Sequence, residues 1–399
     1  MKFLAYLVCY CIYPFSFLFP RNKKKWAFGS FRGGFDGNAK YFFIHVSTQM
    51  PEFDAVWLST NKTTVEEVRS KGLKAFWILS LKGAWLALTS KFWFFNAYTS
   101  DIMFCLSGNA TLVNLWHGLP MKKIEFDIDS GPLADRYVKK TLKERFYHPE
   151  SFKRPDYMLS ASPMYSEMFS RAFRIDIINR CLELGNPRND ILTWPEERRM
   201  AFVKQYEPET TQQLIAELKS GRYQHVFFYL PTWRDSNYDF LGKDFDLKAV
   251  DKAMQESQSL MIFKPHANTA IKEVDDLRLT NVRILSAKTD LYPIMPYTDV
   301  LITDYSSVIN DYLLMDKKGV ILYLFDYHKF TGERSFIWPF DEMVVGKRVF
   351  DFEGLLDAFK EPCLEVDEKQ KEARVCKSWA GNVNRSLEKV AGYFKDLIL

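Results

Sequence analysis

The sequence lacks the cysteine and histidine spacings that hold metal ions. Its six cysteines form no C-x-x-C pair, and none has a histidine at zinc-ligand spacing. This pattern is typical of reduced thiols in a cytosolic protein, so no metal site and no cofactor is predicted. Two D-x-D matches, Asp127/Asp129 and Asp244/Asp246, are too short to indicate a metal and are interpreted as surface or helix-start residues.

Low-complexity tracts, repeats at solenoid periods and a G-x-G-x-x-G fingerprint are also absent. With 399 residues and 47% apolar content, the chain is long enough for two domains with sizeable cores. The net charge of +4 does not indicate a nucleic acid partner. Positive charge is concentrated between residues 136 and 154, which fits either a solvated helix face or a site for anionic lipid or pyrophosphate.

One uncharged, largely apolar run covers residues 3–19, and a basic flank, Arg21 with Lys23–Lys25, follows it. No small-residue cleavage site follows, which argues against a removed signal peptide. As a helix the run would reach about 25 Å, marginal for a membrane span, and Pro14 would kink it. An interfacial anchor fits at least as well as a span, and a buried helix is the third alternative. On the first two interpretations the basic flank places the rest of the chain on the cytoplasmic side.

Short apolar runs alternate with helical segments along the rest of the chain, which predicts α/β domains with parallel sheets. The first series of expected strands is 26–28, 55–58, 75–78, 92–95, 111–115, 157–160 and 182–184. A charged helical stretch, 194–221, precedes a second series: 225–230, 260–263, 282–285, 300–302 and 320–324. Two Rossmann-like halves of similar size predict a GT-B-like architecture with an inter-domain cleft. The expected parts are a membrane-associating segment 1–25 and domains 26–195 and 196–399.

Polar clusters directly follow four of these strands. Ligands of open α/β sheets bind beyond the carboxyl ends of the strands, so the clusters predict one shared site. The four are Trp116-His117-Gly118-Leu119-Pro120, Pro231-Thr232-Trp233-Arg234-Asp235, Lys264-Pro265-His266 and Thr303-Asp304-Tyr305-Ser306-Ser307.

His117 is the candidate general base of this site. A histidine can accept a proton from an attacking hydroxyl near neutral pH, and Gly118 permits a sharp turn and close approach of a substrate. A lone histidine is more often packed against backbone, but the Trp-His-Gly-Leu-Pro-Met-Lys-Lys context favours the catalytic interpretation.

Arg234, Lys264 and His266 offer positive charge and hydrogen-bond donors for phosphate oxygens. A surface ion pair and a helix-capping role are the alternatives for these side chains. Asp304 would repel a phosphate, so a ribose, an amine or a structural contact suits it better.

Ser306 and Ser307 open an expected helix over residues 308–315. Hydroxyls and free backbone N–H groups at a helix N-terminus can bind an anion. A plain serine N-cap is the alternative.

The ordered set of motifs resembles the CDP-glycerol glycerophosphotransferase family of teichoic-acid and capsule synthesis. It comprises the four clusters together with Gly185 and Pro187-Arg188-Asn189-Asp190, and the match runs from about residue 26 to about residue 341. Leu119 stands where the family usually has a threonine. The resemblance implies a donor-binding second domain and an acceptor-binding first domain. It also implies attack of an acceptor hydroxyl on the β-phosphorus of CDP-glycerol, or of another CDP-polyol, with release of CMP.

Under this resemblance His117 and His266 are the catalytic candidates, and the donor-binding candidates are Arg234, Lys264, Asp304, Ser306 and Ser307. The implied partners are a CDP-polyol, a lipid-linked or polymer acceptor and the cytoplasmic face of the cell membrane. Two other functions remain open on the residues. One is a GT-B glycosyltransferase that uses a nucleotide sugar, and the other is a membrane scaffold without enzymatic activity.

Overall fold

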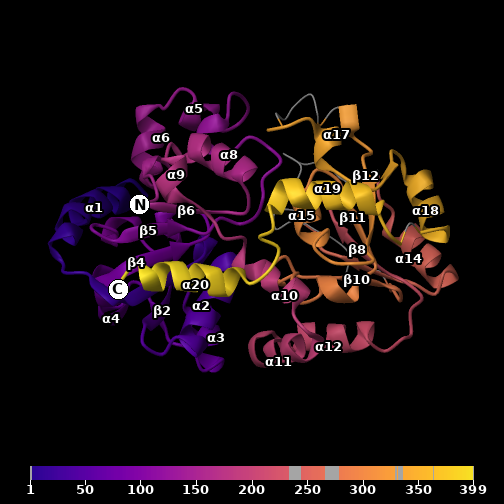
Figure 1. The fold of residues 1–399 in the computed structure, drawn as a ribbon, viewed down its shortest axis with the longest axis horizontal. Helices are drawn as coiled ribbons and strands as arrows, with labels where there is room; N and C mark the ends of the chain where they lie inside the picture. The colour runs from indigo at the N-terminus through magenta and orange to yellow at the C-terminus, as the bar shows by residue number, and fades with distance from the viewer. Residues whose placement is uncertain are drawn as a thin grey trace. The chain divides into compact units, whose positions relative to one another are not determined.

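The computed structural model describes residues 2–232, 244–265, 278–328, 330, 336–362 and 364–398. Arg234 and His266 therefore lie outside the described residues. The chain forms two compact units (Figure 1). Unit 1 comprises Met1–Leu119, Lys123–Asp190 and Ser378–Leu399, and unit 2 comprises Pro120–Lys122 and Ile191–Lys377.

Unit 1 is built on a seven-stranded sheet of order β3-β2-β1-β4-β5-β6-β7, in which every adjacent pair is parallel. This confirms the predicted parallel α/β arrangement. The strands are β1 (Asn22–Gly29), β2 (Asp54–Ser59), β3 (Ala75–Trp77), β4 (Ser90–Phe95), β5 (Thr111–Asn114), β6 (Tyr157–Ser160) and β7 (Cys181–Glu183).

Helices cover both faces of this sheet. The α-helices are α1 (Lys2–Phe15), α2 (Gly37–Gln49), α3 (Lys62–Ser70), α4 (Leu81–Thr89), α5 (Ala134–Tyr137), α6 (Leu142–Tyr147), α7 (Pro149–Phe152), α8 (Pro163–Phe173), α9 (Ile177–Arg180) and α20 (Ser386–Asp396). The 3-10 turns are η1 (Ser16–Leu18), η2 (Phe31–Gly33), η3 (Thr99–Asp101), η4 (Phe104–Leu106), η5 (Glu125–Asp127) and η6 (Pro187–Asn189). Side-chain caps begin several of them; the Asn61 carboxamide, for example, accepts the Thr63 N–H of α3 at 3.0 Å.

Side chains alternate between the two faces of the sheet, as the period of two along a strand requires. On one face Ala27 and Trp93 join a buried cluster with Leu86 of α4. On the other face Trp26 and Phe94 pack against Phe394 of α20, with ring centroids 6.5 and 5.1 Å from it.

Unit 2 has a six-stranded sheet of order β10-β9-β8-β11-β12-β13, again with parallel pairs throughout. Its strands are β8 (Val226–Leu230), β9 (Leu260–Phe263), β10 (Val282–Ile284), β11 (Val300–Thr303), β12 (Gly319–Tyr323) and β13 (Lys347–Val349). Its helices are α11 (Glu196–Tyr206), α12 (Glu209–Leu218), α14 (Leu247–Glu256), α15 (Val308–Tyr312), α17 (Phe340–Met343), α18 (Phe352–Lys360) and α19 (Glu368–Trp379), with η7 (Met295–Tyr297) and, at the junction with unit 1, α10 (Asp190–Thr193).

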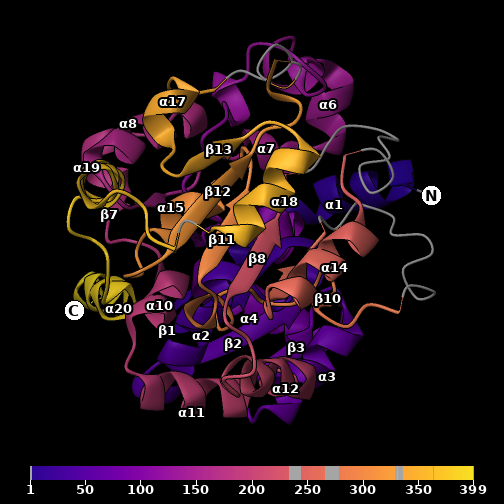
Figure 2. The same ribbon diagram turned by 90° about the vertical axis from the view of Figure 1, so that its right-hand side faces the viewer.

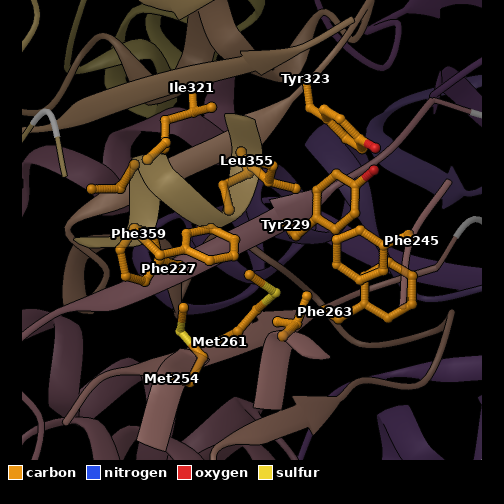
Figure 3. Close-up of a cluster of buried hydrophobic side chains, with 14 of the residues drawn as sticks. Phe227, Tyr229, Phe245, Met254, Met261, Phe263, Ile321, Tyr323, Leu355 and Phe359 are labelled. Carbon is orange, nitrogen blue, oxygen red and sulfur yellow. The ribbon is translucent and has the colours of Figure 1, made fainter. Parts of the chain in front are cut away.

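One face of the unit 2 sheet carries α14 and α18 side by side (Figure 2). The core beneath them is aromatic: Tyr229, Phe245 and Phe263 stack closely, with ring centroids 4.8–5.8 Å apart (Figure 3). Phe227 and Phe359 continue this cluster toward α18. The core fixes the positions of β8, β9 and β11, whose carboxyl ends carry the predicted polar clusters.

Both ends of the chain belong to unit 1, whereas the expected boundaries make residues 1–25 a separate segment and put the C-terminal end in the second domain. The first 25 residues belong to unit 1, where α1 packs and Lys23–Lys25 form part of β1. Helix α20 also belongs to unit 1, because Phe394 is fully buried against its sheet. Among the described helices none is both long enough and apolar enough to cross a membrane; α1 has 14 residues.

Arg21, the first residue of the basic flank, is bound to the protein itself. Its guanidinium donates to the backbone carbonyls of Ala87 at 2.5 Å, Ser90 at 3.1 Å and Leu106 at 2.8 Å, and also to that of Gly108. Because both terminal nitrogens of its guanidinium donate to backbone carbonyls, Arg21 fastens the segment after α1 to the loops around it. Lys23 and Lys24 stay exposed.

Candidate active site

The polar centre of unit 1 lies at the point where the strand order reverses, between β1 and β4. Ligand sites of open α/β sheets form at such switch points. Here the loops after the two strands are joined by Asn96, whose Nδ2 donates to Ser30 Oγ at 2.8 Å and to the Asp36 carbonyl at 3.0 Å. The next strand outward, β5, leads directly into His117.

Buried amides hold the turn that presents His117. Trp116 has a φ of 51°, a left-handed conformation that costs a tryptophan roughly 1–3 kcal/mol, and Gly118 follows with a φ of 133°. Asn38 Nδ2 donates to the carbonyls of Leu115 at 2.9 Å and Trp116 at 3.0 Å. The Trp116 N–H donates to Asn114 Oδ1 at 2.9 Å. The surrounding structure thus enforces a strained turn, as is common at functional sites.

The orientation of the His117 ring leaves one nitrogen available for catalysis. Nδ1 lies 3.4 Å from the Asn96 carbonyl oxygen, and the ring stacks on Trp116 with centroids 4.2 Å apart. A carbonyl can only accept, so this contact places the hydrogen on Nδ1 and leaves the lone pair on Nε2. Nε2 is therefore the atom that can take a proton from a substrate hydroxyl.

The charge state of His117 fits the same role. Desolvation by the surrounding protein, followed by the positive charge of Arg188, lowers the pKa of His117 to about 4. The side chain is itself exposed to solvent, which weakens this desolvation. A lowered pKa means that the imidazole is neutral at pH 7, as a general base must be.

Sequence reasoning missed the groups that support His117. Asp101 is 2% exposed, and its Oδ2 accepts the N–H groups of Asn96 at 3.1 Å and Ala97 at 2.8 Å. Burial raises the pKa of Asp101 to about 7. Asn96 directly follows the predicted strand 92–95, so the sequence placed it at a strand end. No nearby residue in the sequence indicated that it contacts His117.

In unit 2, Asp304 ties together the turns after two neighbouring strands, β8 and β11, at the reversal of the strand order. Its carboxylate accepts the Thr232 N–H at 2.9 and 3.1 Å and the Tyr305 N–H at 2.6 Å. The carboxylate is buried. The sequence analysis left a ribose, an amine or a structural contact open for Asp304. These bonds to backbone N–H groups are a structural contact.

Ser306 and Ser307 follow Asp304 and are half-buried. The helix that they open, α15, has five residues, fewer than the eight predicted. Ser307 makes no side-chain capping bond, and Ser306 Oγ is 3.5 Å from the Val308 nitrogen. Such a short helix has only a weak dipole. If an anion binds here as predicted, the two serine hydroxyls are therefore the main groups that would bind it.

Lys264 directly follows β9 and is half-buried, with its backbone N–H on the Tyr229 carbonyl at 3.1 Å. The structure thus brings Lys264, Asp304 and the Ser306–Ser307 pair to the same carboxyl edge of the unit 2 sheet. The roles of these residues in donor binding stay predictions.

The acidic D-x-D pairs have structural partners. Asp127 pairs with Arg171, and Asp129 with Lys123. Asp246 caps α14 by accepting the Lys248 N–H at 2.8 Å. Within the described ranges, no three His, Cys, Asp or Glu residues gather so that they could hold a metal ion.

Two doubly wound parallel sheets with polar clusters at their carboxyl edges define a GT-B-like α/β protein. Solved structures share this fold. The Wall Teichoic Acid Polymerase TagF has a TM-score of 0.71 at 24% identity over 95% of this chain and 89% of that one. The UDP-GlcNAc 2-epimerase from Neisseria meningitidis has a TM-score of 0.52 at 11% identity over 93% and 100%.

The family can be assigned more narrowly. The sequence model of the CDP-Glycerol:Poly(glycerophosphate) glycerophosphotransferase family matches residues 11–383, and this chain belongs to that family. It is 26% identical to the teichoic acid poly(glycerol phosphate) polymerase of Bacillus spizizenii, over 86% of this chain and 84% of the relative. It is 29% identical to the teichoic acid glycerol-phosphate transferase of Staphylococcus aureus, over 74% and 70%.

Proposed function

We propose that this chain transfers glycerol phosphate from CDP-glycerol to a hydroxyl of a teichoic-acid-type acceptor and releases CMP. The observation that carries the proposal is His117, neutral at pH 7 and held by the Asn96 carbonyl so that Nε2 can accept a proton. Membership of the glycerophosphotransferase family supports the donor, and the names of the relatives support the acceptor.

The proposed reaction transfers one proton, forms one P–O bond and breaks another. Nε2 of His117 takes the proton of the acceptor hydroxyl as its oxygen attacks the β-phosphorus. The bond from this phosphorus to the bridging oxygen breaks, and CMP leaves with the electron pair. Cationic and hydroxyl donors stabilise the charge that builds on the leaving phosphate. Lys264, Ser306 and Ser307 are the described candidates, with Arg234 and His266 as predicted additions.

Analysis of the leaving group separates this proposal from a nucleotide-sugar transferase. Purified protein is incubated with CDP-glycerol and a lipid-linked acceptor, and the nucleotides are resolved by anion exchange. We expect acceptor-dependent CMP, about 100-fold or more slower in His117→Gln, with little change in donor affinity. His148→Gln is the matched control. Inertness towards CDP-glycerol and CDP-ribitol, with turnover of a UDP- or GDP-sugar, would overturn the proposal.

We also propose that unit 1 docks on an anionic membrane surface through an apolar surface formed by α1, the η1 segment that follows it and α4. Leu4 is 65% exposed, Leu18 77% and Leu81 94%. Phe19 and Trp85 join the two parts of this surface, with ring centroids 6.1 Å apart. Burying a single leucine favours attachment by about 1.5–3 kcal/mol, so a patch of this size can hold a protein at an interface.

The opposite side of α1 is fastened to the protein. Tyr6 and Tyr10 contact Phe146 of α6, with ring centroids 6.0 and 5.4 Å away, and Tyr10 OH donates to the Arg145 carbonyl at 3.1 Å. α1 is thus an apolar helix that packs on unit 1 along one side and is exposed along the other. Exposed cationic side chains of α4 and α6 can complement anionic lipid head groups: Lys82, Lys143 and Arg145.

Vesicle flotation tests this attachment. We expect the wild-type protein to float with phosphatidylglycerol-containing vesicles and to float less with purely zwitterionic vesicles or in high salt. The Leu4→Asp/Val8→Asp double variant should stay in the soluble fraction. Phe350→Asp, which changes an exposed aromatic residue of unit 2, is the control and should float normally. Equal flotation of the double variant and the wild type would refute the patch.

A further inference from the structure

In unit 1, side chains fix all four backbone polar groups of Asn96 and Ala97, the two residues that follow β4. Both N–H groups donate to one oxygen, Oδ2 of Asp101, at 3.1 and 2.8 Å. The Ala97 carbonyl accepts from Asn114 Nδ2 at 2.9 Å. The Asn96 carbonyl lies 3.4 Å from Nδ1 of His117. This short segment therefore stands between a buried carboxyl group and the candidate base.

A single peptide group joins Asp101 to His117. The carbonyl of Asn96 and the N–H of Ala97 belong to the same planar unit, and the bond between them is trans. In a trans peptide the C=O and the N–H point in opposite directions. Asp101 holds the N–H on one side and so sets the direction in which the carbonyl meets the imidazole on the other side.

The turn that carries Asp101 is itself firmly packed. Asp101 ends η3, and the next residue, Ile102, is fully buried. At the end of β1, Gly29 packs so closely that a Cβ there would lie 2.6 Å from the Asp101 carbonyl oxygen. A carboxyl group on such a turn has little freedom, so it can hold a peptide in one orientation.

The imidazole depends on this peptide for its orientation. Within the described residues, the Asn96 carbonyl is the one hydrogen-bond partner of the His117 ring. The ring also stacks on Trp116, with centroids 4.2 Å apart. A stacked ring can turn over and keep its stacking contact, so the carbonyl is what selects between the two ring orientations and places the hydrogen on Nδ1.

We infer that Asp101 is a positioning residue that acts on His117 through the Asn96–Ala97 peptide. This inference rests on the proposed glycerophosphotransfer. In Ser-His-Asp triads a carboxylate bonds the histidine directly and fixes its tautomer, whereas here a peptide group lies between the two side chains. Misplacement of a reacting group by about 1 Å can cost on the order of 100-fold in rate, so a partial loss of this hold is measurable.

Two substitutions of Asp101 separate its role as an acceptor from general stability. Asp101→Asn keeps an oxygen that can accept both N–H groups, whereas Asp101→Ala removes the acceptor. We expect Asp101→Ala to lower kcat for CMP release about tenfold with CDP-glycerol affinity nearly unchanged, and Asp101→Asn to keep most of the rate.

Asp251→Ala is the matched control. Asp251 is a buried residue of unit 2 whose Oδ1 likewise accepts two consecutive N–H groups, those of Thr280 at 3.0 Å and Asn281 at 2.7 Å. These residues precede β10 and so lie at the opposite edge of that sheet from the polar clusters. Asp251→Ala should lower the melting temperature and leave kcat within about twofold of the wild-type value.

Nitrogen-15 NMR of the imidazole at pH 8 measures the tautomer without any assay of turnover. We expect the hydrogen of His117 on Nδ1 in the wild type and in Asp101→Asn, and a mixture of both tautomers in Asp101→Ala. A wild-type protein with the hydrogen on Nε2 would overturn the inference even if Asp101→Ala does not fold. An Asp101→Ala protein with the wild-type tautomer would overturn it as well.

The same change in the His117→Gln background completes the test. If Asp101 acts through His117, Asp101→Ala lowers the residual rate there by less than about twofold, because coupled residues are not additive. An equal loss in both backgrounds would overturn the inference and leave the proposed function standing. A wild-type protein that releases no CMP from CDP-glycerol would overturn the proposed function and this inference with it.

Discussion

The pH dependence of turnover tests the state of His117 directly. A general base works only when neutral, and the neutral fraction falls as the pH drops below its pKa. With an ordinary pKa near 6.5, about 76% of the side chain is neutral at pH 7 and about 24% at pH 6. With a lowered pKa, a larger share of the side chain is neutral at both values. We therefore expect the rate contributed by His117 to fall by clearly less than about threefold between pH 7 and pH 6.

Arg188 is the second cause of the lowered pKa and can be removed separately. Arg188→Gln takes away the positive charge near the imidazole, so the pKa of His117 should rise and the acid limb of the pH–rate profile should move to higher pH. Arg188→Lys keeps a positive charge and is the matched control. Because Arg188 is buried, the melting temperatures of both variants are compared first.

Two measurements on one protein sample complete this test. The rate of CMP release is recorded from pH 5 to pH 9, and the imidazole resonances are titrated by NMR, with His117→Gln providing the assignment. A midpoint for His117 at or above 6.5 in the wild type would refute the reasoning. So would an Arg188→Gln profile that coincides with the wild-type profile.

Four further changes probe stability by calorimetry and denaturant titration. Phe394→Ala should destabilise unit 1 by about 3–5 kcal/mol, since a fully buried ring is lost; an effect below 1 kcal/mol would contradict its place in the core. Asp190→Ala removes the acceptor of two α20 N–H groups at 2.9 Å and should cost about 0.5–2 kcal/mol. Asp304→Ala should cost about 1–3 kcal/mol and weaken donor affinity, because the turns after β8 and β11 lose their tie. Ionisation of buried Asp101 opposes folding as the pH rises from about 4 to about 7, so Asp101→Asn should stabilise the protein at pH 8 more than at pH 4.

The sheets were readable from the sequence because their strands are short apolar runs bounded by polar residues. Twelve expected strands coincide with β1 to β12, including the four that precede the polar clusters. β13 was missed, since Lys347-Arg348-Val349 has only one apolar residue and its pairing with β12 is the long-range contact that defines it. The helix after Ser307 ends at Tyr312, three residues before the predicted limit.

The contacts between side chains were harder to predict from the sequence than the strands. The polar cluster marked His117, but the carbonyl that accepts its hydrogen bond lies 21 residues away, and its pKa depends on burial in the finished fold and on Arg188. The return of α20 to unit 1 was equally hidden, because its amphipathic pattern fits either sheet. The closeness of Phe394 to Trp26 and Phe94 shows which sheet it covers. Local patterns specify elements, whereas these contacts depend on the finished topology.

The return of α20 has a consequence for the order in which the ribosome delivers the parts of unit 1. The last strand of its sheet ends at Glu183, but the helix that covers the aromatic face arrives only with residues 386–396. At about 5–20 residues per second, the roughly 210 residues in between take about 10–40 s to synthesise. During this time Trp26, Phe92 and Phe94 lack the part of their cover that Phe394 supplies, so the nascent chain exposes an apolar surface to which chaperones can bind. A stop codon upstream of Phe394 would make that transient state permanent.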